Sequence, residues 1–370
     1  MTVTFLVNGD ASSAMGDRTR AFAARLSAEW RPVIAYRAAG RGLAMGAFHT
    51  SLRSSAPDIV YVMDMAVAGV VAAAYWRLTH RVPIVIDTGD AITALARSSG
   101  VRGPVGIAAT AALERGAFRL ADHVVVRGSF HRDLLASQAL DSTLVPDGVD
   151  LSRFAPVDGL ATKAMLGLGG RVVVGVLGSC TWSPRLRIAY GWDLVEALAQ
   201  LRDLPVSGLL IGDGSGVSHL RERARTLGVA DRLVVAGRRP MDELPALLAA
   251  CDICLSTQTN DVVGNVRTTG KLPLYLACGR FVLASQVGEA AFVLPAEMLV
   301  PYEGVVDLEY PNRLAERIRQ IVTSGRSHAA EDCVAIARRH FDYDVLGPRV
   351  EAMLTRLAVE TRSADARMRA

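Results

Sequence analysis

Short apolar segments without polar alternation recur along this chain, each separated from the next by a loop and a helical pattern. In the first part of the chain they lie at 2–7, 32–36, 58–62, 83–87, 123–127 and 143–146. Because their apolar residues are continuous, the strands that they form need burial on both faces. Such strands, alternating with helices, predict an α/β fold with a doubly wound parallel sheet.

A loop-rich segment divides the chain into two such patterns. PDGVDLSRFAPVDG at 146–159 contains two prolines, two glycines and three aspartates, which is typical of a linker. Beyond it the alternation restarts, with apolar strands at 171–178, 206–214, 232–237 and 252–256. The sequence therefore predicts two Rossmann-like domains, at 1–160 and 161–342, that face each other across a cleft. The last helix, at 343–370, is expected to return toward the N-terminal domain.

Composition limits the partners of such a chain. It carries 41 Lys+Arg against 37 Asp+Glu and only 6% aromatic residues, without a lysine-rich tract, which argues against nucleic acid. The five cysteines are scattered and no secretory signal precedes them, so we expect a cytoplasmic protein. Cys251-x-x-Cys254 lacks a second Cys/His pair at ligand spacing. We expect buried thiols there, and no metal site.

The run at 256–289 has the features of an anion site. Thr268, Thr269 and Gly270 precede a short expected helix whose first turn carries Lys271. Free N–H donors, the positive end of the helix dipole and a cation would then meet at one point, which suits a phosphate. Only two of the 41 Lys+Arg are lysines, so a lysine here is informative. The alternative is an ordinary αβ corner with a solvated basic cap.

The order of these patterns resembles the retaining glycosyltransferases of the GT-B type, which have two Rossmann-like domains, and family 4 in particular. LLIGDGSG at 209–216 is similar to the family's strand and glycine turn, and KLPLYLACGRFVLASQVGE at 271–289 to its donor-binding helix and next strand. The linker at 146–150, PDGVD, is also similar. The resemblance implies metal-independent, cofactor-free transfer of a sugar from a nucleotide-diphosphate donor to a hydroxyl acceptor, with a UDP-sugar favoured weakly over GDP- or dTDP-sugars.

The resemblance also implies where the donor binds. Arg185 and Arg187, in the loop after the first strand of the second domain, become candidates for the diphosphate together with Lys271. A guanidinium can bridge two phosphate oxygens and neutralise the charge of the leaving group. The alternative for the two arginines is a solvated loop. The other expected donor-binding residues are Gly178, Gly212, Arg238, Asn265, Thr268, Thr269 and Gly270.

Three positions depart from the family pattern. Leu274 and Val266 stand where the family has a pair of glutamates, one of which binds the donor ribose. Asp261 and Asn265 are nearby polar substitutes, or else parts of an ordinary loop. Tyr190 stands where a lysine is frequent. These departures leave the donor unassigned and keep open a non-catalytic role.

Strand-end loops of the first domain are expected to meet the acceptor. The resemblance places Gly9 and Asp10, after the first strand, on the acceptor side. Arg18 is either a contact for an anionic acceptor or a surface arginine. The acceptor itself is expected to be a small molecule or a lipid-linked group.

Three further residues of the first domain are candidates for proton transfer. Asp87 and Asp90 follow a buried strand and could form a general-base pair, although Asp90 could equally cap a helix. His131 could shuttle a proton near neutral pH or simply face solvent.

The arginine-bearing apolar segment at 97–119 could lie weakly on an anionic membrane, or be a two-faced domain helix. Arginine and alanine richness hints at a GC-rich bacterial genome, with a role in cell-envelope or natural-product biosynthesis. Rivals with the same architecture are a nucleotide-sugar 2-epimerase, a pseudo-glycosyltransferase that couples non-sugar rings, and a non-catalytic GT-B partner or scaffold protein.

Overall fold

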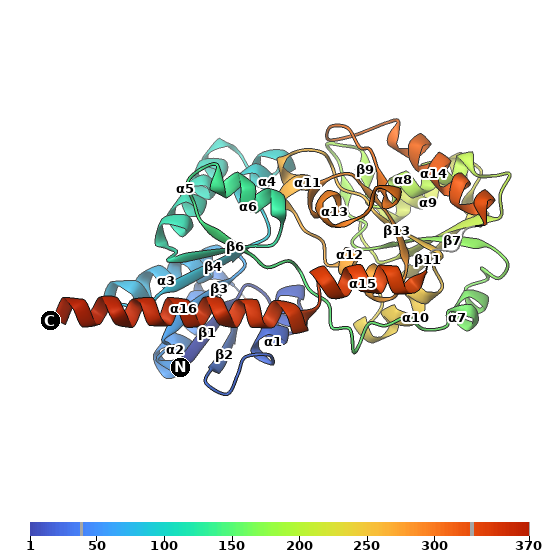
Figure 1. Cartoon of the computed structure of the whole chain (residues 1–370). Helices are drawn as coiled ribbons and strands as arrows, with labels where there is room; N and C mark the ends of the chain where they lie inside the picture. Colours follow the sequence, from blue (N-terminus) through green and yellow to red (C-terminus); the bar gives the residue numbers. More distant parts are fainter. Residues whose placement is uncertain (38–39, 326–328, 370) are drawn as a thin grey trace. The chain divides into compact units, whose positions relative to one another are not determined.

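The computed structural model describes residues 1–37, 40–325 and 329–369. The chain divides into two compact units (Figure 1). Unit 1 comprises Met1–Gly148, Val266–Thr268 and Asp342–Ala370, and unit 2 comprises Val149–Asn265 and Thr269–Phe341. The break after Gly148 falls inside the predicted linker, earlier than the predicted boundary at 160.

Unit 1 is built on a parallel sheet of six strands among the described residues, in the order β2-β1-β3-β4-β5-β6. The strands are β1 (Thr2–Val7), β2 (Arg31–Tyr36), β3 (Ile59–Met63), β4 (Ile84–Thr88), β5 (His123–Val126) and β6 (Ser142–Leu144). Its helices are α1 (Ala14–Ala23), α2 (Arg41–Ser55), α3 (Val67–Thr79), α4 (Ile92–Ser99), α5 (Pro104–Leu120), α6 (Ser129–Ala136) and α16 (Tyr343–Arg369).

Both faces of the inner strands of unit 1 are buried, which explains their continuous apolar sequences. On β1, Phe5 packs in one core with the C-terminal helix α16, while its neighbour Leu6 packs in the opposite core with α2 and α3. Successive side chains of a strand point to opposite faces, so both have to be apolar. At the sheet edge, β2 is partly exposed, unlike the buried strand that its sequence predicts. The C-terminal helix thus joins unit 1, as predicted.

Unit 2 repeats the architecture, again with a parallel six-stranded sheet in the described residues, in the order β11-β10-β7-β12-β13-β14. These strands are β7 (Val172–Leu177), β10 (Val206–Ile211), β11 (Leu233–Gly237), β12 (Ile253–Ser256), β13 (Phe281–Ser285) and β14 (Leu299–Val300), and β8 (Trp182–Ser183) pairs antiparallel with β9 (Ile188–Ala189). Its helices are α7 (Leu160–Met165), α8 (Trp192–Gln200), α9 (Val217–Thr226), α10 (Leu244–Ala249), α11 (Val262–Val266), α12 (Lys271–Ala277), α13 (Gly288–Val293), α14 (Tyr310–Ser324) and α15 (Ala330–His340).

The doubly wound α/β prediction is therefore confirmed for both units. In each sheet the chain runs outward in both directions from its first strand, β1 or β7. Ligands of such sheets bind beyond the carboxyl ends of the strands, at the point where the strand order reverses. Cys251 and Cys254 are buried thiols, as predicted. Within the described residues, no helix has the length and apolar character needed to cross a membrane.

Candidate functional site

In unit 2, the loops beyond β7 and β10 pack against each other through glycines. A Cβ atom on Gly212 would lie 1.9 Å from the carbonyl oxygen of Gly178, and one on Gly214 would lie 2.7 Å from the Cys180 carbonyl. Both residues also have positive φ, 152° and 151°. Gly212 and Gly214 are thus required for the close approach of the two loops. This arrangement agrees with a turn role for these residues.

A pocket of about 440 Å³ lies at these loops. Gly178 and Ser179 line it after β7, Gly212 and Gly214 after β10, and two arginines after β11. The arginines are Arg238, which the sequence prediction contains, and Arg239, which it lacks. Both are exposed at this edge of the sheet, and Arg239 is held by Glu243 at 3.6 Å. The pocket combines backbone turns with cationic side chains.

Lys271 comes close to the same loops from the start of α12. Its Nζ atom lies 3.5 Å from the centre of the Tyr190 ring and 3.6 Å from the position that a Cβ of Gly178 would occupy. The Tyr190 hydroxyl donates to the carbonyl of Leu255 (3.1 Å), which fixes the ring. A cation over the face of a fixed aromatic ring is stabilised electrostatically. Tyr190, at the position where the family often has lysine, therefore places the ammonium of Lys271.

Arg185 and Arg187 lie elsewhere in unit 2. Both are exposed in the turn between β8 and β9, and Arg187 adopts a positive φ of 56°. Arg187 lines a different pocket, with Trp182 and Trp192, and neither arginine lines the Gly178 pocket. The β8–β9 hairpin carries Arg185 and Arg187 away from the Gly178 pocket. The cations at that pocket are Arg238, Arg239 and, beside Gly178, Lys271.

The segment before α12 is held by local hydrogen bonds. The Asp261 carboxylate accepts from the Thr259 hydroxyl (2.9 Å) and from the Gly264 N–H (2.8 Å), at the start of α11. The Asn265 side chain donates to Asn260 and accepts from the Gly288 N–H (3.1 Å). The ordinary-loop alternative describes these contacts, and a role of Asp261 and Asn265 in donor binding stays a prediction.

The structure contains the helix that was expected beside the phosphate site. The helix α12 starts at Lys271, as predicted, with Gly270 as its N-cap, and no side chain caps it. Thr269 accepts a hydrogen bond from the Leu272 N–H through its carbonyl (3.2 Å). The hydroxyl of Thr268 donates to Asp147 within unit 1 (2.8 Å), so this group already has a partner. Phosphate binding by Thr268, Thr269 and Gly270 stays a prediction.

In unit 1, a buried ionic cluster lies at the ends of β4 and β5. Asp87 is fully buried and accepts hydrogen bonds from Arg18 Nη2 (3.1 Å), Arg127 Nε (2.8 Å) and the Tyr61 hydroxyl (3.1 Å). Burial alone would raise the pKa of Asp87, but the two guanidinium groups outweigh it and hold the pKa below its usual value. Asp87 is therefore ionised, and its carboxylate binds three side chains of the same unit, which is a structural role.

This cluster also decides between the two alternatives for Arg18. Its side chain is 1% exposed, so the surface-arginine alternative is wrong. Besides Asp87, the guanidinium donates to the carbonyls of Val145 (2.7 Å) and Pro146 (2.5 Å). These bonds tie α1 to the end of the first unit's sheet. Contact with an anionic acceptor stays a prediction that would need this network to open.

The structure contradicts the solvent-facing alternative for His131 and the helix-capping alternative for Asp90. His131 is 2% exposed instead of facing solvent, and burial lowers its pKa to about 4, so it is neutral at pH 7. Such a ring is a poor proton acceptor near neutrality. Asp90 does not cap α4, whose N-cap is Ala91, and instead pairs with Arg267 at 2.9 Å. Its role as a catalytic base stays a prediction.

The loop after β1 is compact. Asp10 accepts from the Ser12 N–H (2.9 Å) and hydroxyl (2.8 Å), and the N-cap Ser13 accepts from Gly16. A Cβ on Gly9 would lie 2.3 Å from the Ser13 hydroxyl oxygen, so the turn favours glycine there. Contact of Gly9 and Asp10 with an acceptor stays a prediction.

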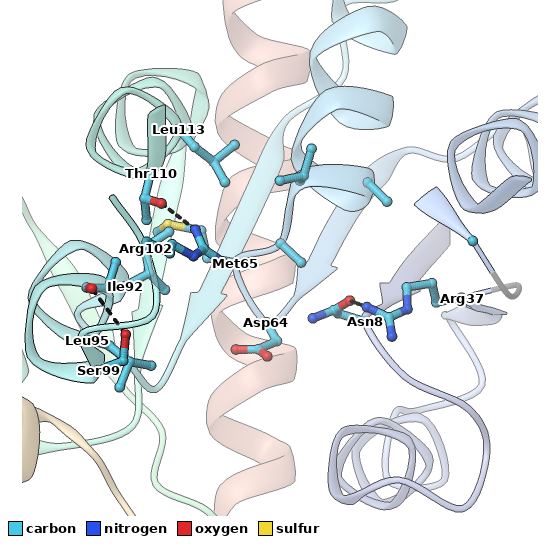
Figure 2. Close-up of a pocket in the computed structure, with 15 residues that line it drawn as sticks. Asn8, Arg37, Asp64, Met65, Ile92, Leu95, Ser99, Arg102, Thr110 and Leu113 are labelled. Atoms are coloured by element: carbon cyan, nitrogen blue, oxygen red, sulfur yellow. Dashed lines mark hydrogen bonds between the residues drawn. The ribbon is translucent and has the colours of Figure 1, made fainter. Parts of the chain in front are cut away.

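A pocket of about 800 Å³ in unit 1 contains a residue that the sequence prediction lacks, Asp64 (Figure 2). Figure 2 shows the Asp64 carboxylate between the Asn8–Arg37 pair, on one side, and the apolar side chains of α4 and α5 on the other. Asp64 directly follows β3, where the strand order reverses, and its φ is 70°. Burial raises its pKa above the usual range, against the opposing effect of Arg127.

The pocket around Asp64 is amphipathic. Its apolar side chains include Met65, Ile92, Leu95 and Leu113, and its polar ones Asn8, Arg37, Asp64, Ser99, Arg102 and Thr110. A non-glycine residue in the left-handed region is uncommon and often marks a functional site. The sequence signal for Asp64 was its place directly after a buried strand, as for Asn8.

Comparison with known proteins gives a family match in unit 2. Residues 173–324 match the family model described as glycosyl transferases group 1. A 2-deoxystreptamine glucosyltransferase of Streptomyces kanamyceticus is 33% identical over 33% of this chain and 32% of its own length. A GDP-mannose-dependent alpha-(1-6)-phosphatidylinositol monomannoside mannosyltransferase of Mycolicibacterium smegmatis is 33% identical over 54% of this chain and 51% of its own. The chain thus spans about a third to a half of these curated relatives.

Solved structures share the fold over nearly the whole chain. The Anabaena protein HepE, solved in complex with UDP, has a TM-score of 0.74 at 18% identity and covers 96% of this chain and 100% of its own. The sucrose-phosphate synthase of Thermosynechococcus elongatus has a TM-score of 0.77 at 18% identity, over 97% of this chain and 99% of its own. The chain therefore has the two-domain GT-B fold, and its second unit contains a segment that the group 1 glycosyl transferase model matches.

Proposed function

We propose that this chain is a glycosyltransferase that moves a sugar from a nucleotide-diphosphate donor to a hydroxyl acceptor, with retention of configuration and without a metal. The observation that carries the proposal is the Gly178 pocket, with Arg238 and Arg239 in its lining and the Lys271 ammonium beside Gly178. The whole pocket lies inside the segment that the glycosyl transferase model matches, 173–324. Retention rests on the resemblance.

Charge stabilisation is the chemistry that this pocket can supply. When the bond between the sugar and the diphosphate breaks, negative charge grows on the departing phosphate oxygen. A cation fixed in advance stabilises that charge more in the transition state than in the bound donor, which lowers the barrier. Lys271, held on the ring of Tyr190 at 3.5 Å, is such a cation. Arg238, with an exposed guanidinium at the pocket, is the second.

We propose a UDP-sugar as the first candidate for the donor. The HepE structures in complex with UDP and with UDP-glucose support this choice through the shared fold. GDP- and dTDP-sugars are the other candidates, and the mycobacterial relative is named as GDP-mannose-dependent. The backbone turns at Gly178 and Gly212 offer contacts that do not depend on the base.

The acceptor, in this proposal, binds unit 1 in the pocket around Asp64. An acceptor hydroxyl can donate to the Asp64 carboxylate, whose raised pKa makes it a better proton acceptor than a solvated aspartate. The apolar side chains of α4 and α5 suit a hydrophobic part of a small-molecule or lipid-linked acceptor. We place this reaction in the cytoplasm.

The first test is a thermal-shift screen of the full chain with UDP, GDP and dTDP. One of the three is expected to stabilise the protein by about 2.7 kcal/mol at a concentration 100 times its Kd. Calorimetry then gives the Kd. Absence of binding by all three nucleotides would remove the donor site and favour the non-catalytic scaffold.

A second measurement separates the transferase from its enzymatic rivals. NMR of the donor nucleotide sugar with enzyme but without acceptor should show an unchanged sugar configuration. Conversion of the donor alone would instead indicate a 2-epimerase. A pseudo-glycosyltransferase would leave the donor unchanged here and would couple non-sugar rings only when an acceptor is added. Nothing in the fold or the family match favours either of these.

Tyr190 offers a graded prediction about the cation at the pocket. Tyr190→Phe keeps the ring under Lys271 and should bind the stabilising nucleotide within about twofold of the natural chain, because the change removes only the hydroxyl, which donates to Leu255. Tyr190→Leu removes the ring and should weaken binding by about tenfold. The Kd of each variant is measured by calorimetry. Equal affinities for the two variants would show that the ring does not position Lys271.

A further inference from the structure

A second pocket of unit 2, of about 650 Å³, shares no lining residue with the Gly178 pocket. It is formed by the β8–β9 hairpin, the helix α8, the loop at 302–308 and the start of α14. Its volume is in the range of small-molecule sites. The transferase reaction proposed above does not use it, so its chemistry can be considered independently.

Three aromatic side chains line this pocket. The rings of Trp182 and Trp192 lie 5.9 Å apart, and Tyr302 belongs to the same lining. Trp182 is braced by His219, whose ring stacks on it at 3.9 Å with 9° between the planes. Tyr302 packs on Tyr310 at 4.7 Å. The aromatic walls are therefore fixed before any ligand arrives, and their faces attract cations.

Three carboxylates complete the lining, and two of them are neutralised. Glu196 accepts from Arg223 at 2.6 and 3.1 Å. Asp307 accepts from Arg313 and from the backbone N–H of Glu303. Asp193, in the first turn of α8, receives no hydrogen bond from another residue in the part of the chain that the structure describes. Burial, with Glu196 nearby, raises the pKa of Asp193 to about 7.

The cations of the pocket leave a place for one more positive charge. The guanidinium of Arg223 lies 5.8 Å from the centre of the Trp192 ring, which shows that this wall already holds a cation. Arg187, the other lining arginine, is exposed at the hairpin turn. Arg223 pairs with Glu196 and Arg313 pairs with Asp307, so these two carboxylates add no net negative charge to the pocket. Among the residues that the structure describes, none forms an ion pair with the third lining carboxylate, Asp193.

We propose that this pocket binds an organic ammonium group, either a protonated amine or a quaternary ammonium, with Asp193 as its counter-ion and Trp182 and Trp192 as its walls. A cation beside Asp193 restores the interactions that the carboxylate lost on burial. The aromatic faces stabilise the same charge. The site is separate from the donor pocket, so its occupancy does not depend on the proposed transferase activity.

The test uses the full chain and a matched pair of probes at pH 8, where Asp193 is largely ionised. Choline and 3,3-dimethylbutan-1-ol have nearly the same shape, but only choline carries a charge. Calorimetry and tryptophan fluorescence should show saturable binding of choline and at least about tenfold weaker binding of the alcohol. Ethanolamine, titrated in parallel, tells a protonated amine from a quaternary ammonium, and saturable binding of either one fits the proposal.

Substitutions locate the binding. Asp193→Asn should weaken choline binding by about tenfold, whereas Asp231→Asn, an exposed acid of the same unit outside the pocket, should leave it unchanged. Trp192→Leu should also weaken choline binding. If the Trp192→Leu variant does not melt cooperatively, Asp193→Asn alone decides the test. Equal binding of choline and the alcohol, an unchanged affinity in Asp193→Asn, or no saturable binding of either ammonium probe would overturn the proposal.

Discussion

Replacement of Lys271 by methionine is expected to lower turnover and nucleotide affinity together, with turnover falling by about a hundredfold. Methionine keeps much of the length of the side chain and removes the ammonium that lies over Tyr190 and beside Gly178. The departing diphosphate then loses a cation at the point where its charge develops. The measurements are kcat with the donor found in the nucleotide screen, and the Kd of that nucleotide by calorimetry.

The chain contains its own control for this experiment, because it has only one other lysine. Lys163 pairs with Asp252 at 2.7 Å and does not line the Gly178 pocket. Lys163→Met should leave turnover and nucleotide affinity within about twofold of the natural chain, with at most about 1 kcal/mol of lost stability. If both methionine variants behaved alike, Lys271 would have no special role at the donor.

Asp87→Asn is expected to destabilise unit 1 by about 3–5 kcal/mol, because it leaves two buried guanidinium groups without their main counter-charge. Arg18 and Arg127 are both nearly inaccessible, and each donates to Asp87. Denaturant unfolding at pH 7 measures the change. Asp344→Asn is the matched control, because Asp344 is 75% exposed and pairs with Arg25 at the surface, so its loss should cost less than about 1 kcal/mol.

The pH dependence of the Asp87 effect has a definite sign. The two arginines depress the pKa of Asp87 in the folded chain below its usual value of 3.8. The stability that the ionised carboxylate contributes is therefore present above about pH 4 and is lost as the pH falls through the folded pKa. The natural chain and Asp87→Asn should converge in stability at the acid end. A difference that persisted unchanged there would argue against an ionised Asp87.

The sequence predicted the layers of this molecule better than its contacts. Runs such as TVTFLV end in consecutive apolar residues because Phe5 and Leu6 enter different cores, and that property is local enough to read from the chain. The edge strand β2 has the same kind of sequence but is partly exposed, since the place of a strand in the sheet depends on the whole topology.

Some predicted residues lie where the sequence pattern does not indicate. The burial of Arg18 depends on Asp87, 69 positions away, and no local pattern announces such a pair. Arg187 was predicted beside the diphosphate, but the two-residue strands β8 and β9 turn it into another pocket. Lys271, by contrast, was predicted correctly at a helix start, because capping residues and a following apolar run are local signals.

The helix α16 has a consequence for how the molecule is made. It follows all of unit 2 in the chain, yet its residues Leu346, Val350 and Leu354 pack in the same core as Val3 and Phe5 of β1. During translation, the strands of unit 1 emerge before unit 2 and stay without this cover until α16 leaves the ribosome. All of unit 2 emerges in the meantime, so the second unit of the chain is the first whose residues are complete.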